Sequence, residues 1–123
     1  MNTTKGNAVE ILLVEDNPGD ARLIRELLSE TTDCRFSCTW VESLGKAIEA
    51  VKNPSIDVVL LDLSLPDSRG FDTFERLHSA AAEVPIILLT GLNDQELAVR
   101  TVHSGAQDYL IKGQLDGALL SRA

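Results

Sequence analysis

The stretch Val58–Gly70, V-V-L-L-D-L-S-L-P-D-S-R-G, indicates how this chain folds. It opens with four consecutive apolar residues, Val58–Leu61, which lead directly to the carboxylate of Asp62. An uninterrupted apolar run of this length is typical of a strand that is buried on both faces, as in a parallel sheet covered by helices. We therefore predict a buried strand whose carboxyl end presents Asp62, followed by a turn in which Asp67 succeeds Pro66.

Four other short runs have a similar character, and helical patterns lie between them. Phe36–Val41 is rich in β-branched and aromatic residues, and we expect it at an edge of the sheet because polar residues interrupt it. The predicted strands are Val9–Val14, Phe36–Val41, Val58–Leu61, Pro85–Leu89 and Tyr109–Ile111.

Apolar residues at helical spacing follow the predicted strands. Asn17 is a candidate N-cap before Pro18, because proline is favoured at the first helical position, and Ser43 is a candidate N-cap of the second helix. Gly105 stands where the fourth helix should end. The five helices are predicted to begin near Pro18, Leu44, Phe71, Asn93 or Asp94, and Asp116, and the fifth is expected to be cut short at Ala123.

Strands that alternate with helices in this way form right-handed βα units. Five such units fit into 123 residues as one domain. We predict an α/β fold, a doubly wound five-stranded parallel sheet with helices on both faces. Residues 1–8 are expected to be a disordered N-terminal segment, and the domain is expected to span residues 9–123. Binding sites in such sheets form at the carboxyl ends of the strands.

The composition argues against several classes of protein. A formal net charge of −8, from 19 acidic and 11 basic residues, disfavours non-specific nucleic-acid binding, which needs a basic surface. Cys34 and Cys38 are too few for a disulfide framework or a zinc site with four ligands. The longest apolar stretches, roughly five residues, are far shorter than the ~20 of a membrane span. Since no signal-peptide pattern is visible either, we expect a cytoplasmic protein.

Polar residues stand where four of the predicted strands end, and they are Glu15, Asp16, Asp62, Thr90 and Lys112. Three carboxylates at one sheet edge repel one another, and a bound divalent cation would offset that repulsion. Oxygen ligands without a neighbouring histidine or cysteine favour Mg2+ over zinc. A carboxylate can also accept a phosphoryl group as a nucleophile, while Mg2+, Lys112 and the Thr90 hydroxyl neutralise the phosphoryl oxygens.

Four motifs in this order resemble the receiver domain of two-component response regulators. They are I-L-L-V-E-D-N at 11–17, V-V-L-L-D-L-S-L-P-D-S-R-G at 58–70, P-I-I-L-L-T-G at 85–91 and G-A-Q-D-Y-L-I-K-G at 105–113. The resemblance covers about Val9–Leu120. It implies the flavodoxin-like strand order 2-1-3-4-5.

The resemblance also implies a role for each residue at the strand ends. Asp62 would accept the phosphoryl group and become a 4-aspartylphosphate. Asp16 would ligate Mg2+ directly, and Glu15 would act nearby, often through water. The metal set implied in this way is Glu15, Asp16, Asp62 and the backbone carbonyl of Ser64.

Further residues would serve the phosphoryl group and its loop. Lys112 would hold the carboxylate and then the phosphoryl group. Thr90 would donate a hydrogen bond to a phosphoryl oxygen and move on activation, with Tyr109 as the aromatic partner in that switch. Pro66 and Gly70 would shape the loop after the third strand.

The resemblance implies partners as well. A histidine kinase or a phosphotransfer protein would supply the phosphoryl group, and the surface of the fourth helix, fifth strand and fifth helix would then change. The domain would catalyse only its own phosphorylation and dephosphorylation, so it is not expected to be an enzyme for other substrates. An output module is expected C-terminal to it in a longer protein, and a homodimer is an option. Direct contact with nucleic acid or a membrane is not expected.

Three positions depart from the commonest pattern of the family. Gly113 follows Lys112 where proline is frequent, so this loop should be more permissive. Glu15 stands where aspartate is frequent, which lengthens the side chain. Leu92 is apolar, and we expect it to shield the phosphoryl group from water and to slow its hydrolysis.

Two other functions fit parts of the pattern. A Mg2+-dependent phosphatase that works through an aspartyl phosphate would need an inserted cap and a general acid two residues after the nucleophile, where this chain has Ser64. A flavodoxin-like flavin binder would need a phosphate-binding first loop, and the acids of Glu15–Pro18 would repel phosphate without a metal. Turnover of small phosphate esters tests the first function, and the absorbance of the purified protein tests the second.

Overall fold

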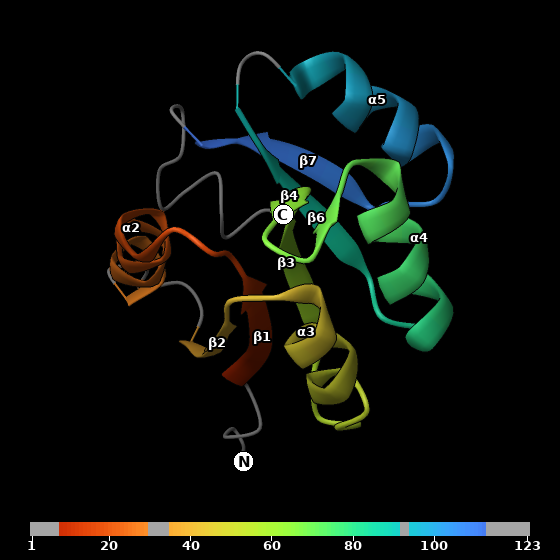
Figure 1. Cartoon of the computed structure of the whole chain (residues 1–123). Helices are drawn as coiled ribbons and strands as arrows, with labels where there is room; N and C mark the ends of the chain where they lie inside the picture. The colour runs from red at the N-terminus through yellow and green to blue at the C-terminus, as the bar shows by residue number, and fades with distance from the viewer. Residues whose placement is uncertain (1–7, 30–34, 92–93, 113–123) are drawn as a thin grey trace.

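The computed structural model describes residues 8–29, 35–91 and 94–112. Five parallel strands form one sheet in the order β2-β1-β3-β6-β7 (Figure 1). These strands are β1 Ala8–Val14, β2 Arg35–Val41, β3 Val58–Asp62, β6 Ile86–Thr90 and β7 Asp108–Ile111. Because β6 and β7 are the fourth and fifth strands of this sheet along the chain, the predicted order 2-1-3-4-5 is confirmed.

Helices cover both faces of the sheet, as predicted. Helix α2 lies over one face, and α3, α4 and α5 lie over the other (Figure 1). These helices are α2 Pro18–Ser29, α3 Leu44–Ala50, α4 Phe71–Ala80 and α5 Gln95–His103. No helix in the described part of the chain is long and apolar enough to cross a membrane.

Some predictions fall on residues outside those described. They concern Cys34, Leu92, Gly113, the helix expected near Asp116, and all of the N-terminal segment 1–8 except Ala8. Ala8 is the first residue of β1.

The apolar runs are continuous because each central strand of the sheet contributes side chains to two hydrophobic cores. Leu12 and Leu61 point to a cluster that includes side chains of α3, α4 and α5. Leu13 and Leu60, their neighbours in sequence, point to a second cluster formed with α2. Alternate residues of a strand face opposite sides of the sheet, so both must be apolar when both sides are covered.

The predicted helix ends are largely confirmed. Ser43 is the N-cap of α3, and its hydroxyl accepts a hydrogen bond from the Lys46 amide at 3.3 Å. The Asn17 side chain accepts from the Gly19 amide at 2.9 Å, in the first turn of α2. Gly105 follows α5 with a φ of 132°, which only glycine adopts readily.

The segment after β3 is more ordered than the predicted turn. It forms a short antiparallel hairpin of β4 Ser64–Leu65 and β5 Ser68–Arg69, with Pro66 and Asp67 between the strands. Gly70 closes the hairpin with a φ of 71°, and its amide donates to the Leu63 carbonyl at 2.7 Å. Two residues per strand are too few to give a periodic pattern, so the sequence carried no signal for them.

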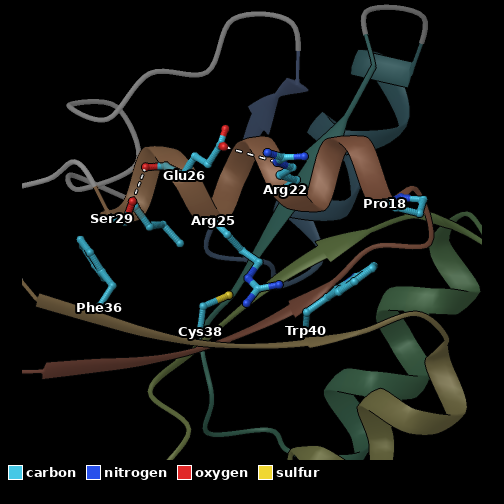
Figure 2. A pocket seen from close by; sticks show the side chains of 9 residues that line it. Pro18, Arg22, Arg25, Glu26, Ser29, Phe36, Cys38 and Trp40 are labelled. Carbon is cyan, nitrogen blue, oxygen red and sulfur yellow. Dashed lines mark hydrogen bonds and ion pairs between the residues drawn. The ribbon is translucent and has the colours of Figure 1, made fainter.

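Strand β2 lies at an edge of the sheet, as predicted, and pairs in the described residues with β1. Its side chains Phe36, Cys38 and Trp40 point toward α2 and line a groove of ≈ 590 Å³ beneath that helix (Figure 2). The indole nitrogen of Trp40 donates to the backbone carbonyl of Glu15 at 2.7 Å. Trp40 therefore packs at the edge and also contacts the end of β1.

Helix α4 offers a matched test of the core. Phe74 is 2% exposed, whereas Phe71 in the same helix is 38% exposed. We expect Phe74→Ala to lower the free energy of unfolding by about 3–5 kcal/mol, because it leaves a cavity. Phe71→Ala should cost less than about 1 kcal/mol. Urea denaturation measures both values, and equal losses would contradict the packing described here.

Candidate metal centre

Three predicted carboxylates meet at the carboxyl edge of the sheet. Glu15 and Asp16 follow β1, and Asp62 ends β3, its neighbour in the sheet. One oxygen from each of the three lies within 4.8 Å of the others. Glu15 is fully buried and Asp62 is 6% exposed, while Asp16 is exposed to solvent.

Lys112 brings a positive charge to the same place. It follows the last residue of β7, and its Nζ lies 2.6 Å from Oε1 of Glu15. The same Nζ donates to Oδ2 of Asp62 at 2.9 Å. The Lys112 side chain therefore reaches past β6 to the carboxylate that follows β1 and the one that ends β3. Only a long, flexible side chain can span this distance.

Asp20 is a member of this cluster that the sequence patterns did not single out. Its Oδ2 accepts a hydrogen bond from Lys112 Nζ at 3.2 Å. An acid in the first turn of a helix is ordinarily explained by the helix dipole, so its type and position gave no distinct signal.

Both oxygens of Asp62 have partners. Oδ1 accepts from the backbone amide of Ser64 at 2.9 Å, and Oδ2 accepts from Lys112. Ser64 is exposed and lines, with the three acids, an open cavity of ≈ 540 Å³. The predicted metal set Glu15, Asp16, Asp62 and Ser64 thus surrounds one space.

Thr90 and Tyr109 lie on the side of the sheet that packs against α3, α4 and α5. Thr90 is 3% exposed and lines a second cavity together with Asp62 and Ser64, while its hydroxyl donates to the Gly91 carbonyl at 3.1 Å. Tyr109 is half-buried against the core, and it is not one of the described residues that line the two cavities. In the register of β6 and β7, Thr90 pairs with Ile111, which lies two residues beyond Tyr109. Thr90 and Tyr109 therefore lie on the same face of the sheet, two positions apart in this register.

The sequence of this chain matches that of a known family. A family model described as the response regulator receiver domain matches residues 11–123. The chain belongs to this family. It is a receiver domain of the kind found in two-component response regulators.

Relatives of this receiver domain are regulators from bacteria and plants. It is 34% identical over 114 residues to the swarming motility regulation protein RssB of Serratia marcescens, a match that covers 93% of this chain and 51% of RssB. It is 31% identical over 104 residues to the cell cycle transcriptional regulator CtrA of Caulobacter vibrioides, covering 85% of this chain and 44% of CtrA. The chain therefore spans about half the length of these relatives.

Solved structures of receiver domains have the same fold. The receiver domain of a sensor histidine kinase from Pseudomonas aeruginosa PAO1, which holds a magnesium ion in its active site cleft, is 30% identical with a TM-score of 0.76, and the match covers 94% of this chain and 93% of that one. The signal receiver domain of an HD domain-containing protein from Pseudomonas fluorescens Pf-5 is 26% identical with a TM-score of 0.80, covering 99% and 89%.

Burial sets the protonation of Glu15 in this receiver domain. Desolvation, followed by the hydrogen bond and charge of Asp62, raises the pKa of Glu15 to about 8, although Lys112 acts in the opposite direction. Burial also disfavours the charge of Lys112, but its contacts with Glu15 and Asp62 outweigh that effect and raise its pKa. Glu15 and Asp62 share the single ammonium group of Lys112.

The donor set of the cavity fits Mg2+. The carboxylates of Glu15, Asp16 and Asp62 offer oxygen, which Mg2+ prefers, and no histidine or cysteine is among the described residues that line the cavity. Oε1 of Glu15 is buried and, among the described residues, has no hydrogen-bond donor of good alignment, although it touches Lys112 as an ion pair. A buried oxygen of this kind is suited to a cation or to a water that a cation holds.

The raised pKa of Glu15 predicts a pH-dependent stability in the absence of metal. A raised carboxyl pKa means that the folded state binds more protons than the unfolded state. Protonated Glu15 therefore contributes fully to the free energy of unfolding below pH 4.5, and this contribution is lost as the pH rises through about 8. In EDTA, we expect the free energy of unfolding to fall between pH 6 and pH 9, and Glu15→Gln to reduce this slope.

Urea denaturation at a series of pH values provides the measurement. Added Mg2+ should stabilise the parent more at pH 9 than at pH 6, because the ion compensates the ionised form. An identical pH slope in the parent and in Glu15→Gln would show that Glu15 does not titrate in this range.

Proposed function

We propose that this receiver domain takes a phosphoryl group from a phosphohistidine onto Asp62, with Mg2+ as the cofactor. The observation that carries the proposal is the surrounding of Asp62. It is a nearly buried carboxylate, 2.9 Å from the Lys112 ammonium and within 4.8 Å of two further acids. Such a group is held in place and stays nucleophilic, and it borders an open cavity large enough for a phosphoryl group.

The proposed transfer exchanges one bond to phosphorus for another. A carboxylate oxygen of Asp62 attacks phosphorus, the bond from phosphorus to the imidazole nitrogen breaks, and the nitrogen keeps the electron pair. Mg2+, when bound by the acids and the Ser64 carbonyl, would neutralise charge on the phosphoryl oxygens. Lys112 supplies the second positive charge. Hydrolysis of the acyl phosphate would then restore Asp62.

Lys112 is suited to serve both states of Asp62. Before transfer it donates to Oδ2 of Asp62, and its flexible stem lets the same ammonium follow a phosphoryl oxygen afterwards. Asp20 also contacts this ammonium, at 3.2 Å, and lines the same cavity. Lys112 is thus held between acids that compete for it, and a phosphoryl dianion would be a stronger competitor.

Thr90 and Tyr109 would transmit the change. The Thr90 hydroxyl now bonds to the adjacent Gly91 carbonyl, a weak local partner that it can exchange for a phosphoryl oxygen. Movement of Thr90 would open space on the sheet face that it shares with Tyr109, next to α5. Phosphorylation would then shift an existing equilibrium of the α5–β7 surface toward the active form.

A histidine kinase or a phosphotransfer protein is the proposed phosphodonor. The receiver domain of the Pseudomonas aeruginosa structure belongs to a sensor histidine kinase, and CtrA is a transcriptional regulator. Because the chain spans about half of its relatives, we propose that an output module receives the signal. A phosphatase acting on other substrates is less well supported, since Ser64 cannot act as the general acid that such an enzyme needs.

Asp62→Asn tests the phosphoacceptor. With Mg2+ and either acetyl phosphate or a histidine kinase, the parent should acquire an acid-labile phosphoryl label, and Asp62→Asn should acquire none. Asp57→Asn is the matched control, because Asp57 precedes the other end of β3 and accepts a hydrogen bond from the Glu10 amide at 2.9 Å. Its label should equal that of the parent. Full labelling of Asp62→Asn by intact-mass measurement would refute the assignment.

A further inference from the structure

Two backbone amides of α3 are bound by a side chain from a distant loop. Asp67, at the turn of the β4–β5 hairpin, accepts from the Leu44 amide through Oδ1 at 2.9 Å and from the Gly45 amide through Oδ2 at 3.0 Å. Amides in the first turn of a helix have no acceptor within the helix. Since Ser43 accepts from Lys46, Ser43 and Asp67 divide the amino end of α3 between them.

The contact of Asp67 is made by hydrogen bonds and not by burial. The Gly45 and Leu44 amides lower the pKa of Asp67, so the carboxylate is ionised and both bonds are charge-assisted. Asp67 is exposed to solvent, and its removal would leave no hole in the core. A Cβ placed on Gly45 would lie 3.6 Å from Oδ2, an ordinary contact, so lack of space does not dictate this pairing.

The hairpin that Asp67 holds is part of the candidate metal centre. The backbone amide of its first residue, Ser64, donates a hydrogen bond to Asp62, and Ser64 lines the cavity of ≈ 540 Å³ that the three acids border. At the base, Gly70 bonds to the Leu63 carbonyl, and Leu65 is buried in the core beside α3. The hairpin is therefore fixed at its base by β3 and at its tip by α3, with Ser64 between these two points.

We propose that Asp67 is a positioning residue, which holds the β4–β5 hairpin against α3 so that Ser64 keeps its place beside Asp62 and the metal. This inference rests on the proposed function in taking the Ser64 carbonyl as a metal ligand. Without the two hydrogen bonds, the hairpin tip can move. Metal binding must then also fix the position of Ser64, which costs conformational entropy. That added cost weakens the binding.

Asp67→Ala tests the inference, with Ser43→Ala as the matched control. Ser43 caps the same helix but does not connect it to the hairpin, so Ser43→Ala reproduces a loss of helix capping without loosening Ser64. We expect Asp67→Ala to weaken Mg2+ binding about fivefold, the equivalent of one lost cap. Asp67→Asn, which retains one acceptor oxygen, should have an intermediate effect.

Two measurements separate positioning from general stability. Mg2+ titration is followed by calorimetry and by the fluorescence of Trp40, the single tryptophan, whose indole bonds to the Glu15 carbonyl. Amide hydrogen exchange is measured without metal, where the Ser64 amide should lose protection in Asp67→Ala and keep it in Ser43→Ala. Parent values for both quantities in Asp67→Ala, or equal losses in the two variants, would overturn the proposal.

Labelling with acetyl phosphate at saturating Mg2+ distinguishes this result from failure of the proposed function. Asp67→Ala should then still be labelled on Asp62, because it retains every group that contacts the phosphoacceptor. If the parent itself acquires no label, the proposed function fails, while the exchange of the Ser64 amide still decides whether Asp67 holds the hairpin.

Discussion

Two buried carboxylates, Glu15 and Asp62, lie against the ammonium group of Lys112, and this excess of negative charge governs the carboxyl edge of the sheet. Removing charged groups from water is costly unless they are compensated. The protein compensates in part through Lys112 and in part through the raised pKa of Glu15. When Glu15 ionises, two carboxylates share the one ammonium group of Lys112, so a bound cation would be favoured, and we interpret this preference as the basis of the proposed chemistry.

The fold keeps this charged edge in place by burying apolar residues on both faces of the strands that carry it. Strands β1 and β3 are central in the sheet and contribute to both cores. Their backbones are fixed by parallel pairing, so the positions of Glu15 and Asp62 are set by register. Lys112 reaches the same point from the end of β7 through a long, flexible side chain.

The loops around the edge are held by polar contacts between elements that are distant in sequence. Trp40 on β2 bonds to the Glu15 carbonyl, and Asp67 in the hairpin bonds to two amides of α3. Contacts of this type restrain a loop without filling space in the core. They leave the cavity beside Asp62 open while the backbone around it is held in place.

The strand order, the helix starts at Pro18 and Leu44, and the meeting of Glu15, Asp16 and Asp62 could all be predicted from the sequence. They follow from local patterns and from the rule that parallel strands end at one edge. The contacts of Asp20 and Asp67 could not, because nothing in their own neighbourhoods distinguishes them from ordinary helix and turn acids. Their partners lie 92 and about 22 residues away, and only the packing of α2, α3 and the hairpin brings them together.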